Sequence, residues 1–249
     1  MAANSLNVIA LISGGKDSLF SILHCIANGH KVVALANLYP AAADDQNEDI
    51  DSYMYQTVGH SAIPLYEAAL GIPIYRQPIA GSAVDHARDY RGPGSHEADD
   101  DDDDADETES LLPLLRRVKA AHPAANAVSS GAILSTYQRT RVESVALRAG
   151  LAPLAYLWQW PSLPPYAEAA LLADMRAVGM DARIVKVAGG GLDEGALWGN
   201  VADARVTARL ERAAARFGTP GDGAVVGEGG EFETLAVDGP GPLWKRRIQ

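Results

Sequence analysis

Cysteine is nearly absent from the sequence: Cys25 is the only one among 249 residues. A single thiol can form neither an internal disulfide nor a cysteine-based metal cage. No apolar stretch approaches the ~20 residues that a membrane span requires. The first residues, MAANS, also lack the basic and long apolar regions of a secretion signal. We therefore expect a soluble, cytoplasmic protein with no membrane partner.

Basic residues are missing from one short segment that contains most of the excess acid. The formal net charge is −11, but residues 97–109 (EADDDDDDADETE) hold ten acidic residues and no basic one. Without this run the net charge would be only −1. The overall negative charge therefore says little about which partners the protein binds. We interpret it as a solvated, disordered insert near 92–109 that contributes nothing to a core. Because no clustered basic stretch appears elsewhere, direct nucleic-acid binding is not expected.

Strand-like and helix-like segments alternate along the rest of the chain. Apolar runs typical of strands occupy residues 8–12, 31–36, 72–76, 127–129, 151–160 and 182–188. Apolar residues at helical spacing indicate helices over residues 19–26, 57–70, 111–118, 142–149, 171–178 and 206–217. This alternation predicts an α/β fold with a parallel sheet and helices on both faces. The segment PSLPP (161–165) predicts a boundary between a first domain, 1–160, and a smaller C-terminal α/β domain, 161–249.

The sequence SGGKDS (13–18) lies where the first strand gives way to the first helix. Ligands of open parallel sheets bind at the carboxyl ends of the strands, and a helix start offers N–H groups and partial positive charge to an anion. Gly14 and Gly15 let the backbone approach a phosphate closely, and Lys16 adds a full positive charge. The segment therefore predicts a phosphate site, with a glycine turn beside a surface lysine as the alternative.

Two common phosphate-binding fingerprints do not fit this loop. A Walker A loop requires Gly at the position of Ala10 and Ser or Thr at that of Asp17. The dinucleotide fingerprint requires a third glycine, which the segment around Phe20 lacks. SGGKDS after a first strand instead resembles the pyrophosphate loop of N-type ATP pyrophosphatases. The resemblance implies an adenine nucleotide alpha hydrolase-like (HUP-type) fold, in which ATP is cut between its α and β phosphates. It also implies that the loop residues bind ATP: Ser13, Gly14, Gly15, Lys16, Asp17 and Ser18.

Three further segments narrow this resemblance. They are EDIDSYMYQTVGH (48–60), VSSGAILSTYQRTRVE (128–143) and GEGGEFETL (227–235). Together they resemble the diphthine–ammonia ligases. The resemblance implies that ATP adenylates the diphthine carboxylate on translation elongation factor 2, and that ammonium then gives diphthamide, AMP and pyrophosphate. It also implies that the C-terminal domain is truncated at its end, because the family continues past the final strand.

Cations and N–H donors are needed where charge develops at the α-phosphate. Lys16, Arg139 and Arg141 are the candidates, although solvated helix positions are the alternative for the two arginines. Ser130, Gly131 and Gln138 belong to the second family segment and are expected to bind nucleotide; the glycine would let the backbone approach the adenosine.

Magnesium, which would accompany ATP as part of the substrate complex, requires carboxylate oxygens near the phosphates. Asp17 is the first choice for this ligand, with Asp49 and Asp51 behind it. No tightly bound organic cofactor is expected.

The last segment places three acids within six residues, interleaved with glycines. Such a pattern favours a tight turn over a solvated strand face, with a surface hairpin as the alternative. We expect Glu228, Glu231 and Glu233 to be catalytic, orienting ammonium and accepting its proton. Cys25 lies in the middle of a helix, so a built-in glutaminase is not expected and the ammonia comes as free ammonium or from a separate protein.

Two other functions remain open at this point. One is RNA modification by another N-type ATP pyrophosphatase, although RNA thiolation usually needs a reactive cysteine pair and Cys25 is alone. The other is a nucleotide-binding module without turnover, against which the intact SGGKDS loop argues.

Overall fold

Five parallel strands form the main sheet of the protein. The computed structural model describes residues 5–41, 58–90, 92, 106–219 and 221–249. The strands are β1 (Asn7–Leu11), β2 (Lys31–Tyr39), β3 (Ile74–Pro78), β4 (Ala127–Ser129) and β5 (Ala152–Leu154). Their order is β3-β2-β1-β4-β5, and every neighbouring pair is parallel. The predicted parallel α/β fold is thereby confirmed.

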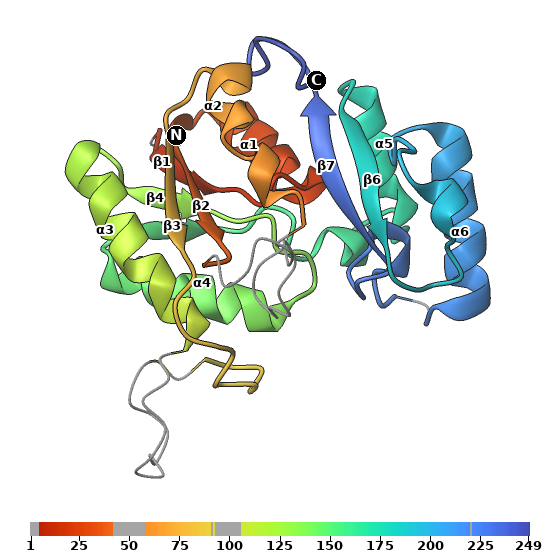
Figure 1. Cartoon of the computed structure of the whole chain (residues 1–249), viewed down its shortest axis with the longest axis horizontal. Helices are drawn as coiled ribbons and strands as arrows, with labels where there is room; N and C mark the ends of the chain where they lie inside the picture. The colour runs from red at the N-terminus through yellow and green to blue at the C-terminus, as the bar shows by residue number, and fades with distance from the viewer. Residues whose placement is uncertain (1–4, 42–57, 91, 93–105, 220) are drawn as a thin grey trace.

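Helices cover both faces of this sheet (Figure 1). They are α1 (Lys16–Ala27), α2 (Leu65–Leu70), α3 (Leu111–Ala121) and α4 (Thr136–Arg148). Leu19 of α1 and Leu70 of α2 share a core with Leu35 of β2, whereas Leu114 of α3 and Val145 of α4 pack on the opposite face. Because side chains alternate between faces along a strand, β2 supplies both cores.

A second, two-stranded sheet follows in the chain. It consists of β6 (Asp181–Val187) and β7 (Phe232–Asp238), accompanied by α5 (Ala169–Ala177) and α6 (Ala204–Phe217). The two strands are antiparallel, unlike the parallel arrangement that strand–helix alternation suggested. β7 lies between β6 and α1 (Figure 1), and Leu19, Leu171, Ile184 and Leu235 belong to one hydrophobic cluster. The two halves of the chain therefore share a core, and the boundary between residues 160 and 161 stays a prediction.

Short 3-10 helices occupy several connections: His60–Ala62, Glu107–Ser110, Trp160–Ser162, Glu194–Ala196 and Ala224–Val226. The helix expected over 57–70 is confirmed over Leu65–Leu70 only, and the first of these 3-10 helices precedes it. Gly59 adopts a left-handed conformation with φ of 77°, and Pro64 has no N–H to extend a helix through this region. The expected stop at Gly71 is observed, whereas Thr57 lies outside the described residues.

The described end of the acidic run differs from the expected solvated loop. Asp106 accepts hydrogen bonds from the N–H groups of Thr108 and Asp85, and Glu107 is buried. Glu109 forms an ion pair with Arg148 at 2.7 Å. Local capping and this ion pair order the last acids of the run, and residues 93–105 lie outside the described part of the chain.

Helix α6 aligns four arginines that the linear sequence separates. Arg205, Arg209, Arg212 and Arg216 follow one another at intervals of four, three and four residues, which places them on one side of a helix. The sequence analysis missed this basic line because its members are not adjacent in the chain. No helix within the described ranges combines the length and apolar character that crossing a bilayer requires.

Candidate active site

The SGGKDS loop connects the central strand β1 to α1. Its neighbour β4 runs beside β1 on the other side from β2, so the strand order reverses between β1 and β4. Ligands of open α/β sheets bind at this reversal, beyond the carboxyl ends of the strands. Gly15 is the N-cap of α1 and provides no side-chain cap, so the helix start faces the region beyond the sheet. The fold therefore places the loop at the expected ligand-binding edge.

A cavity of about 300 Å³ opens over this loop. One part of its wall is polar and includes Ser13, Lys16, Asp17 and Ser18 of the loop. The other part is apolar and comes from β1, β2, α3 and α4. Its apolar lining residues are Leu11, Ile12, Ala36, Leu38, Leu111, Leu114 and Val142. The cavity thus has a charged end and an apolar end, which suits a molecule with phosphates at one end and a flat ring at the other.

The second family segment forms the adjacent wall. Ser130, Gly131 and Gln138 all line the cavity, and Ser135 caps α4 by accepting a hydrogen bond from the Gln138 N–H. A Cβ at Gly131 would lie 2.5 Å from the Ser18 nitrogen and 2.6 Å from the Asp17 carbonyl carbon. The glycine is therefore required for close packing of two backbone segments, the start of α1 and the loop after β4. This is a different reason from the approach to adenosine that the sequence suggested.

Two glutamates of the third segment reach the same cavity from the C-terminal half. Glu228 and Glu233 line it, although they follow the SGGKDS loop by more than 200 positions in the chain. Glu231 does not belong to the lining. Its carboxylate instead accepts a hydrogen bond from the Gly229 N–H at 3.1 Å, and its carbonyl accepts one from the Ala188 N–H.

Acid exceeds base at the polar end of the cavity. Lys16 Nζ lies 2.6 Å from Asp17 Oδ2, whereas the buried Oδ1 of Asp17 has no hydrogen-bond partner. Burial raises the pKa of Asp17 against the opposing effect of Lys16. Burial and then the charge of Asp17 raise the pKa of Glu228 to about 8, with smaller contributions from Glu233 and Glu231, while Lys16 lowers it. Glu228 can therefore gain or lose a proton near neutral pH.

The cavity offers few protein ligands to a magnesium ion. Among the described residues, no three His, Cys, Asp or Glu side chains are grouped closely enough to hold a metal by themselves. Magnesium in nucleotide sites typically uses one or two carboxylates and completes its shell with phosphate oxygens and water. The unpartnered oxygen of Asp17 fits that role. Asp49 and Asp51, the reserve candidates, lie outside the described residues.

The two arginine candidates do not line the cavity. The Arg139 guanidinium stacks on the ring of Trp158, 3.7 Å from its centroid, and lies 3.4 Å from Glu143. Arg141 is fully buried inside the protein. Arg139 and Arg141 thus occupy positions on α4 that the structure does not bring together with the SGGKDS loop.

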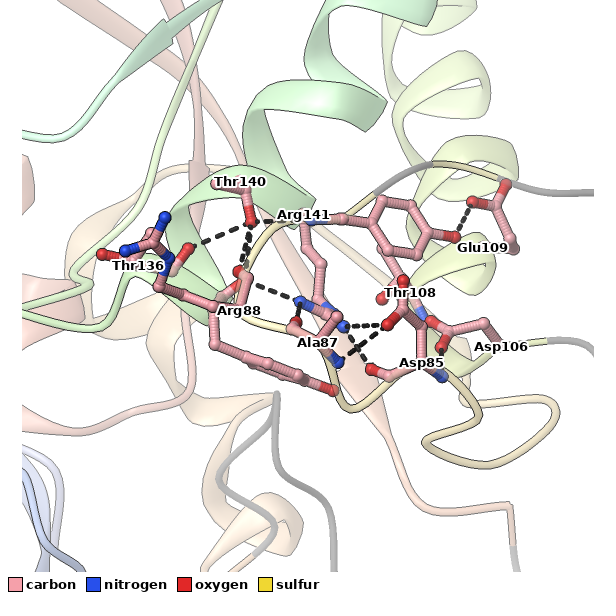
Figure 2. A network of polar contacts seen from close by, with 11 residues as sticks. Asp85, Ala87, Arg88, Asp106, Thr108, Glu109, Thr136, Thr140 and Arg141 are labelled. Carbon is pink, nitrogen blue, oxygen red and sulfur yellow. Dashed lines mark hydrogen bonds and ion pairs between the residues drawn. The ribbon is translucent and has the colours of Figure 1, made fainter. Parts of the chain in front are cut away.

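Arg141 is the centre of a polar network between α4 and the segment after β3 (Figure 2). Its guanidinium donates hydrogen bonds to the carbonyls of Asp85, Ala87 and Tyr137 and lies 3.8 Å from the Asp85 carboxylate. It also stacks on the Tyr137 ring at 3.3 Å. Thr140 accepts a hydrogen bond from the Tyr90 N–H. This network fixes the loop around residue 85 to α4.

Several cavity residues escaped the sequence analysis. The apolar lining looked like ordinary core, and only the strand order brings Leu38 of β2 and Leu111 of α3 to the same opening. Asn37 also lines the cavity, where it donates to the Ile12 carbonyl and accepts from Arg76 Nε, both at 2.9 Å. A polar residue near the carboxyl end of a strand beside β1 was the available signal. Thr234 of the third family segment lines the cavity as well, although the sequence pattern predicted no role for it.

Comparison with known proteins adds an independent finding. Residues 6–99 match the family described as diphthamide synthase N-terminal domain, and residues 168–249 match the diphthamide synthase C-terminal domain. The chain is 44% identical to a zebrafish (Danio rerio) protein named diphthine–ammonia ligase over 245 residues, which are 98% of this chain and 86% of that one. It is 42% identical to the human protein of that name, covering 82% of it. It is also 44% identical to the Schizosaccharomyces pombe protein, of which it spans only 36%.

Proposed function

The chain belongs to the diphthine–ammonia ligase family, and from that premise we infer that it is a C–N ligase that amidates diphthine to diphthamide with ammonia and ATP. Relatives in zebrafish and human that carry this name match nearly the whole chain. These names favour neither RNA modification nor nucleotide binding without turnover. A cytoplasmic location and elongation factor 2 as the diphthine-bearing protein stay predictions.

One observation carries the proposal: three segments far apart in the sequence meet around one cavity with a polar and an apolar end. We assign the apolar end, near Leu38, Leu111 and Val142, to the adenine ring. The phosphates then lie along the loop, where the Lys16 ammonium and the start of α1 supply positive charge. Asp17 would hold magnesium, which supplies charge neutralisation of the phosphates.

The first half-reaction forms an acyl-adenylate. A carboxylate oxygen of diphthine attacks the α-phosphorus, the bond to the β-phosphate oxygen breaks, and pyrophosphate leaves with that electron pair. Lys16 and the loop stabilise the charge on the leaving pyrophosphate. Four other loop residues would orient the pyrophosphate: Ser13, Gly14, Gly15 and Ser18. The opposite wall of the cavity would contact the nucleotide through Ser130, Gly131 and Gln138.

The second half-reaction is assigned to the glutamates. Ammonium must lose one proton before its nitrogen attacks the acyl carbon. AMP then leaves with the electrons of the broken C–O bond, and the new amide nitrogen releases a second proton to solvent. Glu228 suits the role of proton acceptor because its pKa of about 8 is near the working pH. Glu233 would hold the ammonium beside it. Glu231, whose carboxylate is bonded to its own turn, would shape that turn instead.

The experiment that tests this function is incubation of the protein with ATP, magnesium, ammonium and elongation factor 2 that carries diphthine. We expect diphthamide on the factor, detected by mass spectrometry, together with AMP and pyrophosphate in equal amounts. Omission of ammonium should stop diphthamide formation. ADP and phosphate as the nucleotide products would contradict the proposal, and so would an unmodified factor.

A further inference from the structure

The SGGKDS loop is bonded to the second sheet as well as to the first. β6 pairs with one edge of β7, and the loop occupies the other edge. There the Ala236 N–H donates to the Gly14 carbonyl at 2.8 Å, and the Lys16 N–H donates to the Thr234 hydroxyl oxygen at 3.1 Å. A strand from the far end of the chain therefore determines where the loop backbone lies.

Tyr66 of α2 closes this arrangement from a third direction. The side chain is fully buried, and its hydroxyl lies 2.9 Å from the Gly14 carbonyl and 2.5 Å from the Ala236 carbonyl. One hydroxyl proton is thus shared between the loop and β7. Only glycine fits at position 14, because its φ is +87° and a Cβ there would lie 2.7 Å from Ile63 Cδ1. Its carbonyl is oriented by two separate donors.

We propose that Thr234 and Tyr66 are positioning residues that hold the SGGKDS loop in the shape that binds pyrophosphate. They would act through the backbone of Lys16 and Gly14. Thr234 follows Glu233 directly, so one strand would set the pyrophosphate loop and also present a glutamate to the cavity. The inference rests on the proposed function, since it names how the phosphate end of that site is built.

Energetics favour a loop that is fixed before ligand arrives. A backbone that must be ordered on binding loses affinity by the ordering cost, and preorganisation removes that loss. The Thr234 hydroxyl is buried and bonded to the first N–H of α1, where a small displacement would turn the helix start away from the cavity. Loss of this oxygen should therefore weaken binding without removing any group that contacts the adenine.

The test measures inorganic pyrophosphate and AMP binding by calorimetry to the full chain. Thr234→Val keeps the shape and removes the acceptor, and we expect a dissociation constant for pyrophosphate about tenfold higher, with AMP affected less. Thr234→Ser restores the oxygen and should bind nearly as the wild type does. Tyr66→Phe should shift pyrophosphate binding in the same direction as Thr234→Val.

Matched controls separate positioning from general stability. Thr207→Val removes a buried hydroxyl that bonds the Val201 carbonyl near the start of α6, away from the loop. It should lower the melting temperature and leave the pyrophosphate dissociation constant unchanged. Tyr75→Phe, which loses a contact to His122, is the matching control for Tyr66→Phe.

Each outcome decides a different claim. If the wild type binds neither AMP nor pyrophosphate, the proposed function fails. If the wild type binds both and Thr234→Val binds pyrophosphate equally well, the function stands and the positioning role is wrong. Tighter binding by Thr234→Val would also overturn the inference, because it would mean that the hydroxyl competes with phosphate for the Lys16 N–H.

Discussion

Lys16 and Arg141 are both buried cations, yet their surroundings differ in kind. Among the described residues, Lys16 pairs with Asp17 alone, and it shares its cavity with Glu228 and Glu233. Arg141 is enclosed by three backbone carbonyls, the Asp85 carboxylate and an aromatic face. The first cluster faces a cavity and raises the pKa of Glu228. The second distributes its charge over protein groups, although the buried Arg141 Nε has no hydrogen-bond partner there. Buried charge that faces a cavity is available for a ligand, and buried charge surrounded by protein holds the fold.

Arg141→Met should cause the largest loss of folding stability. Removing one partner of a buried charged network costs about 3–5 kcal/mol of folding free energy. We expect a strong loss of stability in urea unfolding, and Arg141→Lys should not rescue it because an ammonium cannot reproduce the guanidinium fork. AMP affinity, corrected for the folded fraction, should stay near the wild-type value. A stable variant that no longer binds AMP would place Arg141 at the nucleotide.

Lys16→Ala should lower turnover strongly and stability little, which is the opposite of the effect expected for Arg141→Met. Loss of a preorganised charge at a reacting phosphate typically lowers turnover by about a hundred- to a thousand-fold. Within the described residues the Lys16 ammonium forms one ion pair and one contact with an aromatic ring, that of Phe232 at 5.7 Å. Its removal should therefore change the melting temperature far less than Arg141→Met does. Diphthamide formation and thermal unfolding of both variants test this contrast. Wild-type turnover in Lys16→Ala would mean that the loop is structural.

The raised pKa of Glu228 makes the stability of the protein depend on pH. Its folded-state pKa of about 8 exceeds the ordinary 4.5, so its contribution to stability is fully present below about pH 4.5 and is lost as pH rises through 8. The charges that face it are Asp17, Lys16, Glu233 and Glu231. Glu228→Gln should therefore flatten the fall in melting temperature between pH 5 and pH 9.

A matched control for this pH effect is Glu231→Gln, whose carboxylate is bonded outside the cavity lining. It removes only the smallest of the charges that raise the pKa of Glu228, so it should keep nearly the wild-type pH profile. If melting temperature depends on pH identically in Glu228→Gln and Glu231→Gln, the pKa of Glu228 is not specially raised. Glu228 would then lose its proposed role as proton acceptor.

The smallest effect on stability is expected from removal of most of the acidic run. Replacing residues 93–105 by a short Gly-Ser linker should change the unfolding free energy by less than about 0.5 kcal/mol, the usual range for changes remote from buried features. The Glu107 N–H donates to the Ser82 carbonyl at 2.8 Å, so the two described flanks are already joined. The deletion must spare Asp106, Glu107 and Glu109. Lower turnover of the deletion variant at low salt only would reveal a docking role for the acids.

Sequence patterns predicted the elements that depend on local chemistry. The SGGKDS loop, the strands around it and the order of the family segments were all recoverable, because apolar runs and glycines signal them directly. The helix expected over 57–70 is confirmed over Leu65–Leu70 and its stop at Gly71, but its start was placed too early, because Gly59 and Pro64 interrupt the helical backbone. Helical spacing could not tell the inward position of Arg141 from the cavity-facing position of Gln138, three residues before it.

Contacts between residues far apart in the chain could not be predicted from the sequence either. Nothing local distinguishes Thr234 as a partner of the Lys16 N–H, or Gly131 as a contact of the α1 backbone. Both depend on which strands become neighbours. The same holds for the antiparallel β6–β7 pair, which alternation of strands and helices could not reveal.

Activation of a carboxylate by adenylation in this cavity would leave an isotopic trace. The most direct measurement uses elongation factor 2 whose diphthine carboxylate carries ¹⁸O, incubated with the protein, ATP, magnesium and ammonium. If the carboxylate attacks the α-phosphorus, the oxygen that bridged carbon and phosphorus leaves with the nucleotide. We therefore predict one ¹⁸O in AMP for each diphthamide formed, and none in pyrophosphate. Label in inorganic phosphate beside ADP would show an acyl phosphate instead, and would contradict the account.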